Sequence, residues 1–333
     1  MNTNKPTSLV LGDGGWGTAL AILLHGNGCP VRIWSKFPAY VKRMRATRQN
    51  PKFLPGIKIP QEIELTSDLK SAVKGISFII MAVPTQYCRG VLQELKPFYS
   101  RDVPVVSVTK GIEQGTLKRP SEIIRDVLNP KHIAVLSGPS HAEEVSRKLP
   151  AGVVIASNNT GFAKHLQNIF SNDYFRVYVQ KDMLGVEIAA AVKNIIAIAA
   201  GICDGLGLGD NIKSALLIRG MVEISRLGMA MKARRETFFG LAGMGDLITT
   251  CISPHGRNRA VGLRIGRGET LKQIVGSMEQ VAEGVWTTRA ALKLAGKHNV
   301  EMPITEEVAN ILFKNKDPKR AIRDLIKRPL KSE

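Results

Sequence analysis

Two patterns of hydrophobic and polar positions divide the chain. In the first part, short apolar runs alternate with helical stretches, which is typical of strands joined by helices. From about residue 182 onward the strand signals nearly vanish and long apolar helical patterns follow. We therefore predict an α/β fold with a doubly wound parallel sheet in residues 1–183 and an all-helical domain in residues 184–333. The predicted strands are residues 7–11, 31–34, 63–66, 78–83, 105–108, 133–137, 153–156 and 175–179.

A glycine-rich turn joins the first predicted strand to the first predicted helix. Gly12, Gly14 and Gly17 form a GxGxxG motif in this context. The first glycine permits the tight turn, the second lets the backbone approach a pyrophosphate, and the third lets the helix pack on the strand. The helix N-terminus offers N–H groups to phosphates. The motif predicts a Rossmann-like dinucleotide site, the alternative being a glycine turn without a ligand.

The end of the second predicted strand bears on which dinucleotide binds. A carboxylate there would bind the ribose 2′-hydroxyl of NAD, but the sequence has Ser35 and Lys36. A small hydroxyl followed by a cation is better suited to a 2′-phosphate. NADPH is therefore slightly favoured over NADH. In the competing interpretation, Lys36 is an ordinary surface lysine.

Lys193 interrupts an apolar run, residues 188–203, that is otherwise typical of a buried helix. Burying an ammonium costs several kcal/mol unless it is paired, so Lys193 is a candidate functional residue. Alternatively it snorkels to the surface. The run is shorter than the roughly 20 residues of a membrane span. Asp246 lies in a glycine-rich apolar segment that solvates it poorly, so Lys193 is its obvious partner.

Further polar residues lie where ligands collect. Lys110 follows one predicted strand and residues 137–140 follow another, and ligands bind at such strand ends in open α/β sheets. Arg257 could bind a phosphate through two hydrogen bonds, the alternative being a surface salt bridge. With a nicotinamide cofactor, these residues suggest hydride exchange at a carbon bearing oxygen, with Lys193 moving the proton. Burial and Lys110 would lower the pKa of Lys193, whereas Asp246 would raise it, so the net direction stays open.

Composition and charge narrow the function class. The 333 residues are 44% hydrophobic, and the polar N-terminus lacks an apolar signal core, so we expect a cytoplasmic protein that is not embedded in a membrane. The four cysteines have no metal-ligand spacing, which predicts reduced thiols and no metal site. The net charge of +19 is compatible with a nucleic-acid or membrane surface or with anionic small substrates. Because the basic residues are dispersed and aromatics make up only 5%, we expect no specific nucleic-acid partner.

Ordered motifs run along the whole chain. They include GxGxWGTALA at residues 12–21, NPKFLPG at 50–56, TKGIE at 109–113, SGPS at 137–140, VKNIIAIAAGICDGLGLGDN at 192–211, GLAGMGDL at 240–247 and GRNR at 256–259. With these motifs the chain closely resembles the NAD(P)-dependent glycerol-3-phosphate dehydrogenases of bacterial type. The resemblance implies reversible reduction of dihydroxyacetone phosphate to sn-glycerol 3-phosphate with NADPH or NADH, which supplies glycerophospholipid synthesis. It also implies that the protein is a homodimer.

The resemblance also implies roles for individual residues. Lys193 is the expected proton donor and acceptor, with Lys110 and Asp246 beside the substrate. The other expected substrate contacts are Gly138, Ser140, Gly256, Arg257 and Asn258. The expected cofactor contacts are Gly12, Gly14, Gly15, Trp16, Gly17, Lys36, Phe53, Lys110, Ala142, Arg257, Val281 and Glu283.

Three residues depart from the family pattern. Gly15 stands where the family usually has Ser or a similar small polar residue, which removes one contact to the pyrophosphate. Gly256 replaces the Ser that normally precedes Arg-Asn. Asp13, usually Ala, brings a negative charge near the phosphates, and a like charge at about 4 Å would cost about 4 kcal/mol at an effective dielectric constant of about 20. We therefore expect the Asp13 side chain to point outward.

Two other functions compete with this one. A lysine-dependent reductase of another small keto or hydroxy acid would share the architecture, but Arg257 and Asn258 together with Lys110 favour a phosphate over a lone carboxylate. A non-catalytic nucleotide-binding or nucleic-acid-binding protein belongs to a different class. It would bind the cofactor without turnover, and its affinity for nucleic acid would fall steeply with salt.

Overall fold

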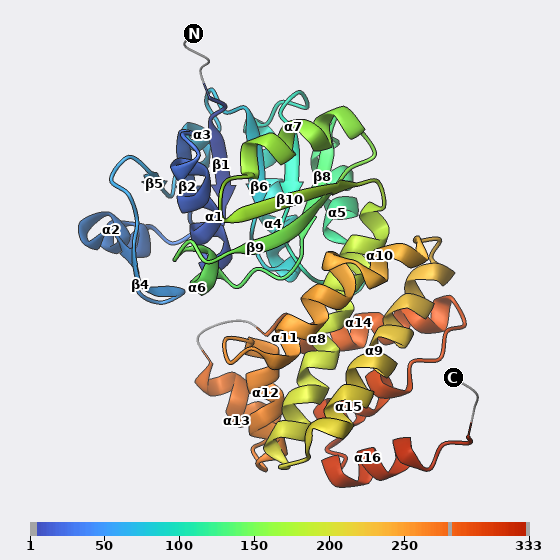
Figure 1. Cartoon of the computed structure of the whole chain (residues 1–333). Helices are drawn as coiled ribbons and strands as arrows, with labels where there is room; N and C mark the ends of the chain where they lie inside the picture. The colour runs from blue at the N-terminus through green and yellow to red at the C-terminus, as the bar shows by residue number, and fades with distance from the viewer. Residues whose placement is uncertain (1–4, 279–281, 331–333) are drawn as a thin grey trace. The chain divides into compact units, whose positions relative to one another are not determined.

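The computed structural model describes residues 5–278 and 282–330 of the chain (Figure 1). The chain forms two compact units. The N-terminal unit comprises residues 1–110 and 118–187, and the C-terminal unit comprises residues 111–117 and 188–333. The sequence-based boundary between residues 183 and 184 stays a prediction.

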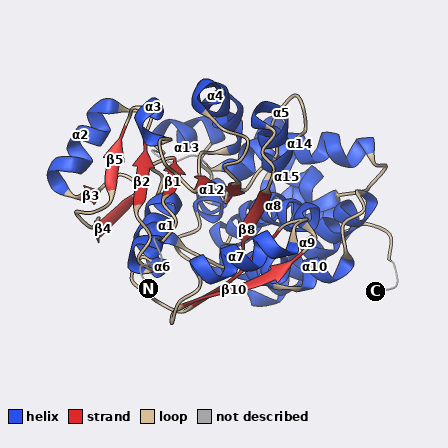
Figure 2. Cartoon of the chain, turned by 90° about the horizontal axis from the view of Figure 1, so that it is seen from above, coloured by secondary structure: helices blue, strands red, loops and turns tan. Residues whose placement is uncertain are grey.

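The N-terminal unit is built on an eight-stranded sheet with the strand order β10-β9-β8-β7-β6-β1-β2-β5. Each predicted strand of this sheet is present, and Figure 2 distinguishes the strands from the helices. The strands are β1 (Ser8–Leu11), β2 (Val31–Trp34), β5 (Glu64–Thr66), β6 (Phe78–Met81), β7 (Val105–Ser107), β8 (Ile133–Ser137), β9 (Ala151–Ala156) and β10 (Phe175–Gln180).

The predicted doubly wound sheet is confirmed, but it is not parallel throughout, which corrects that part of the prediction. Strand β9 pairs antiparallel with β8, and β10 then pairs parallel with β9. The connection from β8 to β9 contains one helix of four residues, α6 (Ala142–Val145). Parallel neighbours need a long crossover, usually through a full helix, whereas antiparallel neighbours do not. The hydrophobic pattern predicted where these strands lie but not their direction.

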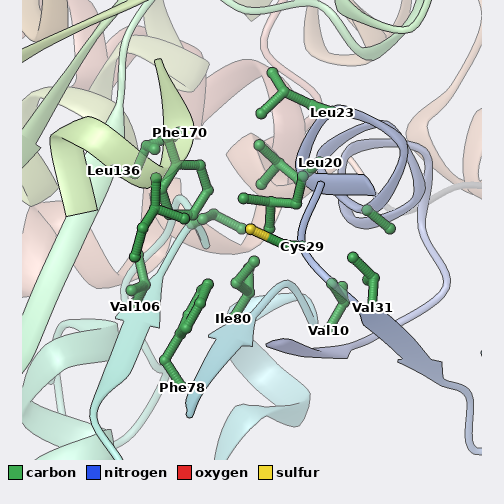
Figure 3. Packing of buried hydrophobic residues seen from close by; sticks show 14 of the residues in the cluster. Val10, Leu20, Leu23, Cys29, Val31, Phe78, Ile80, Val106, Leu136 and Phe170 are labelled. Atoms are coloured by element: carbon green, nitrogen blue, oxygen red, sulfur yellow. The ribbon is translucent and has the colours of Figure 1, made fainter. Parts of the chain in front are cut away.

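Helices and a small hairpin complete the N-terminal unit. The hairpin, β3 (Gln49–Asn50) with β4 (Leu54–Lys58), was not predicted, because β3 has two residues and β4 is mostly exposed. The core contains side chains from the sheet and from the helices that pack on it, among them Leu20, Phe78, Ile80 and Phe170 (Figure 3). The helices are α1 (Gly15–Gly26), α2 (Pro38–Thr47), α3 (Leu69–Ala72), α4 (Thr85–Leu95), η1 (Lys96–Phe98), α5 (Pro120–Leu128), α6 and α7 (Thr160–Phe170).

The C-terminal unit is helical in the part that the structure describes, as predicted. Its longest helix, α8 (Met183–Gly205), begins in the N-terminal unit. The other helices are α9 (Asp210–Ala230), α10 (Arg235–Phe239), the π-helix η2 (Leu241–Gly245), α11 (Asp246–Ile252), α12 (Arg257–Gly266), α13 (Leu271–Ser277), α14 (Glu283–Lys297), α15 (Pro303–Lys314) and α16 (Pro318–Ile326).

Helix α8 is a core helix. Its 23 residues exceed the predicted apolar run, so its length and composition alone are sufficient for a membrane span. However, 94% of its apolar window is buried within the protein. Burial to this extent indicates a helix in the core of a folded domain.

Helices α8 and α12 pack backbone against backbone through glycines. A Cβ atom built at Gly262 of α12 would lie 1.9 Å from the Ile198 carbonyl oxygen, and one at Gly201 of α8 would lie 2.0 Å from the Arg259 carbonyl oxygen. Gly205 and Gly266 meet the facing helix in the same way, at 2.3 Å and 2.6 Å from carbonyl oxygens. Because no side chain fits between the two backbones, this contact fixes how α12 lies on α8.

Replacement of Gly262 by Ala should destabilise the protein. The new methyl group meets rigid backbone, and overpacking of this kind costs about 1–3 kcal/mol or more. The matched control is Gly296→Ala in α14, where an added Cβ has open space and Ala should be neutral or stabilise by about 0.5–1 kcal/mol. Urea unfolding of both variants measures the difference, and equal stabilities would contradict the close packing of α8 and α12.

A buried carboxylate on α9 holds the beginning of α15. Glu223 is 3% exposed and accepts hydrogen bonds from the backbone N–H of Ile304 at 2.6 Å and from the backbone N–H and hydroxyl of Thr305 at 3.2 and 3.1 Å. Burial raises the pKa of Glu223 to about 7, although these hydrogen bonds act in the opposite direction.

This raised pKa predicts a pH-dependent stability. The folded protein holds the Glu223 proton more tightly than the unfolded chain, whose glutamates titrate near about 4.3. The stabilisation is therefore complete at acidic pH and is lost as the pH rises to about 7. Over this pH range the free energy of unfolding of the wild type should fall by on the order of 3 kcal/mol through Glu223. Glu223→Gln, which has no titrating proton, should not show this fall. Unfolding of both proteins at several pH values is the measurement, and parallel stability curves would contradict the raised pKa.

Candidate functional site

The glycine turn lies at the carboxyl end of β1. Gly12 has a φ of 112°, in the region that favours glycine. A Cβ atom at Gly17 would lie 2.6 Å from the Gly12 carbonyl oxygen and 3.2 Å from Val10 Cγ1 on β1. The surroundings of Gly14, immediately before α1, are open. The conformational role predicted for Gly12 and the packing role predicted for Gly17 are confirmed, whereas a Cβ at Gly14 would meet no atom within 4 Å.

Gly15, Phe53 and Ala142 lie together at the beginning of α1. A Cβ atom at Gly15 would lie 2.4 Å from the Phe53 carbonyl oxygen and 3.6 Å from Ala142 Cβ. The structure therefore brings together three of the residues predicted to contact the cofactor. A serine at position 15 would meet the Phe53 backbone. Glycine, which replaces the usual small polar residue here, allows the loop between β3 and β4 to approach closely.

Trp16 follows in the first turn of α1 and packs on the sheet. Its ring centroid lies 6.5 Å from that of Phe175 on β10. The indole Nε1–H is buried and has no hydrogen-bond partner within the described ranges. A buried donor without a partner is uncommon, and it leaves one N–H near the glycine turn for another acceptor.

Asp13 points inward, so the prediction for its side chain was wrong. The residue is 8% exposed, and its Oδ2 accepts a hydrogen bond from the Ser35 hydroxyl at 2.6 Å. Burial raises the pKa of Asp13, whereas the Ser35 hydrogen bond and the charge of Lys52 lower it. The prediction considered repulsion from phosphates and overlooked this hydroxyl at the end of β2.

Lys36 lies on the surface beside Ser35. Its Nζ is 2.5 Å from Glu94 Oε1 of α4, and both side chains are exposed. Exposed ion pairs contribute about 0–1 kcal/mol. The pair therefore leaves Lys36 able to exchange partners.

The two polar turns after β7 and β8, each predicted to face a ligand, contact one another. Lys110 Nζ donates to the Gly138 carbonyl oxygen at 3.3 Å, and the Ser140 hydroxyl donates to the same oxygen at 2.9 Å. Gly138 has a φ of 145°, and a Cβ there would lie 2.9 Å from the Val153 Cα. The structure thus gathers Lys110, Gly138 and Ser140 at one edge of the sheet.

Lys193 is buried in α8 and paired with Asp246 at the start of α11. Lys193 is 4% exposed and Asp246 is 2% exposed, and Lys193 Nζ donates to Asp246 Oδ1 at 2.6 Å. The predicted pairing is confirmed. The snorkelling alternative is wrong, because the ammonium group lies inside the protein.

Thr250 is a third member of this cluster, and the sequence reasoning missed it. Lys193 Nζ also donates to the Thr250 hydroxyl, which itself donates to the Asp246 carbonyl oxygen at 2.7 Å. Thr250 lies four residues after Asp246 on the same helix, so both share one face. That spacing was the available signal.

The beginning of α12 carries Arg257 and Asn258. Arg257 is exposed, whereas Asn258 is buried and its Oδ1 accepts a hydrogen bond from the Gly284 N–H at 2.9 Å. Gly284 in turn lies against α8, since a Cβ there would be 2.7 Å from the Asn194 carbonyl oxygen. The residue after Lys193, the start of α14 and Asn258 therefore lie close together.

The last predicted ligand contacts are Gly256, Glu283 and Val281. A Cβ atom at Gly256 would lie 2.9 Å from the Thr250 carbonyl oxygen, so glycine accommodates this close approach. Glu283 begins α14 and is half-buried. Val281 lies outside the described residues. Across residues 5–278 and 282–330, the structure places no group of three His, Cys, Asp or Glu side chains that could hold a metal ion.

Two family models match most of the chain. The model for the N-terminus of NAD-dependent glycerol-3-phosphate dehydrogenase matches residues 8–163, and the model for its C-terminus matches residues 182–323.

Named relatives match over nearly their whole length. The chain is 47% identical over 326 residues to the glycerol-3-phosphate dehydrogenase, NAD(P)+, of Fusobacterium nucleatum, covering 97% of each chain. It is 48% identical over 327 residues to the enzyme of the same name from Chlorobium phaeobacteroides, covering 97% of this chain and 98% of the relative. Among solved structures, the glycerol-3-phosphate dehydrogenase of Coxiella burnetii has a TM-score of 0.94 and 40% identity, covering 97% of this chain and 99% of that one.

Proposed function

The chain belongs to the family of NAD-dependent glycerol-3-phosphate dehydrogenases, and from this premise we propose that Lys193 is the acid and base of its reaction. The protein is a glycerol-3-phosphate dehydrogenase that uses NAD or NADP. We propose that it interconverts dihydroxyacetone phosphate and sn-glycerol 3-phosphate. The observation that carries the proposal is a buried ammonium held by a carboxylate and a hydroxyl, Lys193 with Asp246 and Thr250.

The residues around the glycine turn fit a bound dinucleotide. The space beside Gly14 is open, and within the described part of the chain no side chain caps the N-terminus of α1 and the Trp16 indole N–H has no partner. Together they offer N–H donors to a pyrophosphate. When bound, the nicotinamide supplies or accepts the hydride.

Lys193 would move the proton at the substrate oxygen. In the reduction, its Nζ donates a proton to the carbonyl oxygen of dihydroxyacetone phosphate as that oxygen gains negative charge. In the oxidation, the neutral amine accepts the hydroxyl proton of glycerol 3-phosphate. Asp246 and Thr250 hold Nζ in one orientation throughout. Asp246 also balances the buried charge, and loss of one partner of a buried pair typically costs about 3–5 kcal/mol.

Arg257 and Asn258 would bind the substrate phosphate. Arg257 presents an exposed guanidinium at the first residue of α12, a helix of ten residues whose N-terminus is capped by no side chain of the described residues. Asn258 uses Oδ1 to accept from Gly284, and its Nδ2 makes no hydrogen bond within residues 5–278 and 282–330. A guanidinium, an amide N–H and a helix N-terminus are suitable donors for a phosphate dianion. Lys110, with Gly138 and Ser140, would contact the substrate as well.

We also propose the cellular setting from the family resemblance. Reduction of dihydroxyacetone phosphate would supply glycerol 3-phosphate for glycerophospholipid synthesis. The enzyme would act in the cytoplasm as a homodimer.

Replacement of Lys193 by Ala should abolish most of the turnover while the cofactor still binds. Loss of a general acid lowers the rate by about 10²–10⁴-fold. Steady-state kinetics and a nicotinamide fluorescence titration of the same preparation provide both readouts. Lys272→Ala, an exposed lysine of α13, is the matched control and should keep normal kinetics. A Lys193→Ala variant with near-normal turnover would refute the proton-transfer role.

Replacement of Arg257 by Ala should chiefly raise the KM for dihydroxyacetone phosphate. A hydrogen bond between charged groups contributes about 1.5–3 kcal/mol, which corresponds to an increase of about 10- to 150-fold. Arg267→Ala, an exposed arginine just after the end of α12, should leave the KM unchanged. If both variants saturate with the substrate as the wild type does, the phosphate assignment is wrong.

A further inference from the structure

The carboxylate of Asp13 lies at the end of β2, where dinucleotide-binding folds usually carry an acid. That acid normally follows the last glycine of the motif by about 20 residues and binds the ribose 2′-hydroxyl. Here the position is Ser35, directly after β2, and Ser35 hydrogen-bonds to Asp13 from the glycine turn. A carboxylate is therefore present at the usual place, although it comes from another element.

The hydrogen bonds of Ser35 leave it nothing to offer a phosphate. Its hydroxyl proton is donated to Asp13 Oδ2 at 2.6 Å, and its oxygen accepts the Phe37 N–H at 3.3 Å. A 2′-phosphate needs donors, and Ser35 has one proton, which Asp13 takes. The sequence-based preference for NADPH assumed that this hydroxyl was free.

The carboxylate keeps one oxygen for a ligand. The Ser35 hydroxyl binds Oδ2, no other side chain among the described residues hydrogen-bonds to the carboxylate, and the only other donor to it is the backbone N–H of Asp13 itself. The Asp13 backbone is held as well, because Asn50 Nδ2 donates to its carbonyl oxygen at 2.6 Å. A fixed carboxylate with one accessible oxygen is suited to accept a hydrogen bond from a hydroxyl.

The charges near this position also favour a hydroxyl over a phosphate. A 2′-phosphate would bring nearly two negative charges toward the Asp13 carboxylate. The charge of Lys52 acts on Asp13, and Lys36 is paired with Glu94. A 2′-phosphate would therefore have to take Lys36 from Glu94 and compete with Asp13 for Lys52.

We propose that Asp13, held by Ser35, binds the ribose 2′-hydroxyl of the cofactor and makes this enzyme prefer NADH to NADPH. This inference rests on the proposed function, because it concerns the same cofactor site. It reverses the slight preference for NADPH expected from Ser35 and Lys36.

The test compares the two cofactors in binding and in turnover. The Kd values of NADH and NADPH are measured by nicotinamide fluorescence, and kcat/KM is measured with dihydroxyacetone phosphate. The wild type should favour NADH by about 10- to 150-fold, the range expected for one hydrogen bond to a charged group. Asp13→Asn, which keeps the shape but removes the charge, should reduce this ratio about tenfold or more, chiefly through tighter NADPH binding.

Three further variants separate the possible causes. Ser35→Ala keeps the Asp13 carboxylate but removes the hydrogen bond that holds it, so this variant should also lower the preference for NADH over NADPH. It provides the test if Asp13→Asn does not fold. Asp102→Asn removes an exposed acid that precedes β7 and pairs with Lys131; it should leave the ratio unchanged. Lys36→Ala tests the alternative that this lysine binds a 2′-phosphate and sets the cofactor preference. A wild type that prefers NADPH, with a preference lost in Lys36→Ala, would overturn the proposal.

Binding and turnover distinguish failure of this inference from failure of the proposed function. If dihydroxyacetone phosphate is reduced but Asp13→Asn and Ser35→Ala leave the Kd ratio unchanged, the role of Asp13 is wrong and the proposed function stands. If neither cofactor supports turnover while the Kd ratio responds to Asp13 as expected, the proposed function fails and the role of Asp13 stands.

Discussion

The buried ammonium of Lys193 must be neutralised, and the C-terminal unit provides its partners from another helix. Asp246 and Thr250 lie one turn apart on α11 and both contact Lys193 Nζ. Separately, the glycine contact between α8 and α12 places the first turn of α12 near the residue after Lys193, through Asn258 and Gly284. Helix α8 thus carries Lys193 and also positions the first turn of α12, where the proposed phosphate donors lie.

The N-terminal unit positions its polar groups through the ends of its strands. The turn after β1, the residue after β2 and the turns after β7 and β8 each supply part of the candidate site. Glycines at these turns let backbone segments approach to distances that a Cβ atom would prevent, at Gly15 and Gly138 in particular. The turn after β1 also leads into the N-terminus of α1, whose N–H groups lie where a dinucleotide phosphate binds in folds of this kind.

The sequence predicted most of what depends on local pattern and on charge balance. The strands followed from apolar runs, and the Lys193–Asp246 pair followed from the cost of burying either charge alone. Three features depend on tertiary contacts that a linear pattern does not contain. These are the antiparallel direction of β9, the hairpin of β3 and β4, and the inward orientation of Asp13 toward Ser35. The roles of the individual site residues remain predictions, because a role is defined by a bound ligand.

The most direct test of the account follows the absorbance of reduced nicotinamide cofactor as dihydroxyacetone phosphate is added to the folded protein. Unphosphorylated dihydroxyacetone is the matched control, since it offers the same carbonyl without the phosphate. The account predicts that the cofactor is oxidised with the phosphorylated ketone and hardly at all with the control. Equal rates with both ketones would contradict the phosphate site, and no oxidation with either, in protein that binds the cofactor, would contradict the proposed reaction.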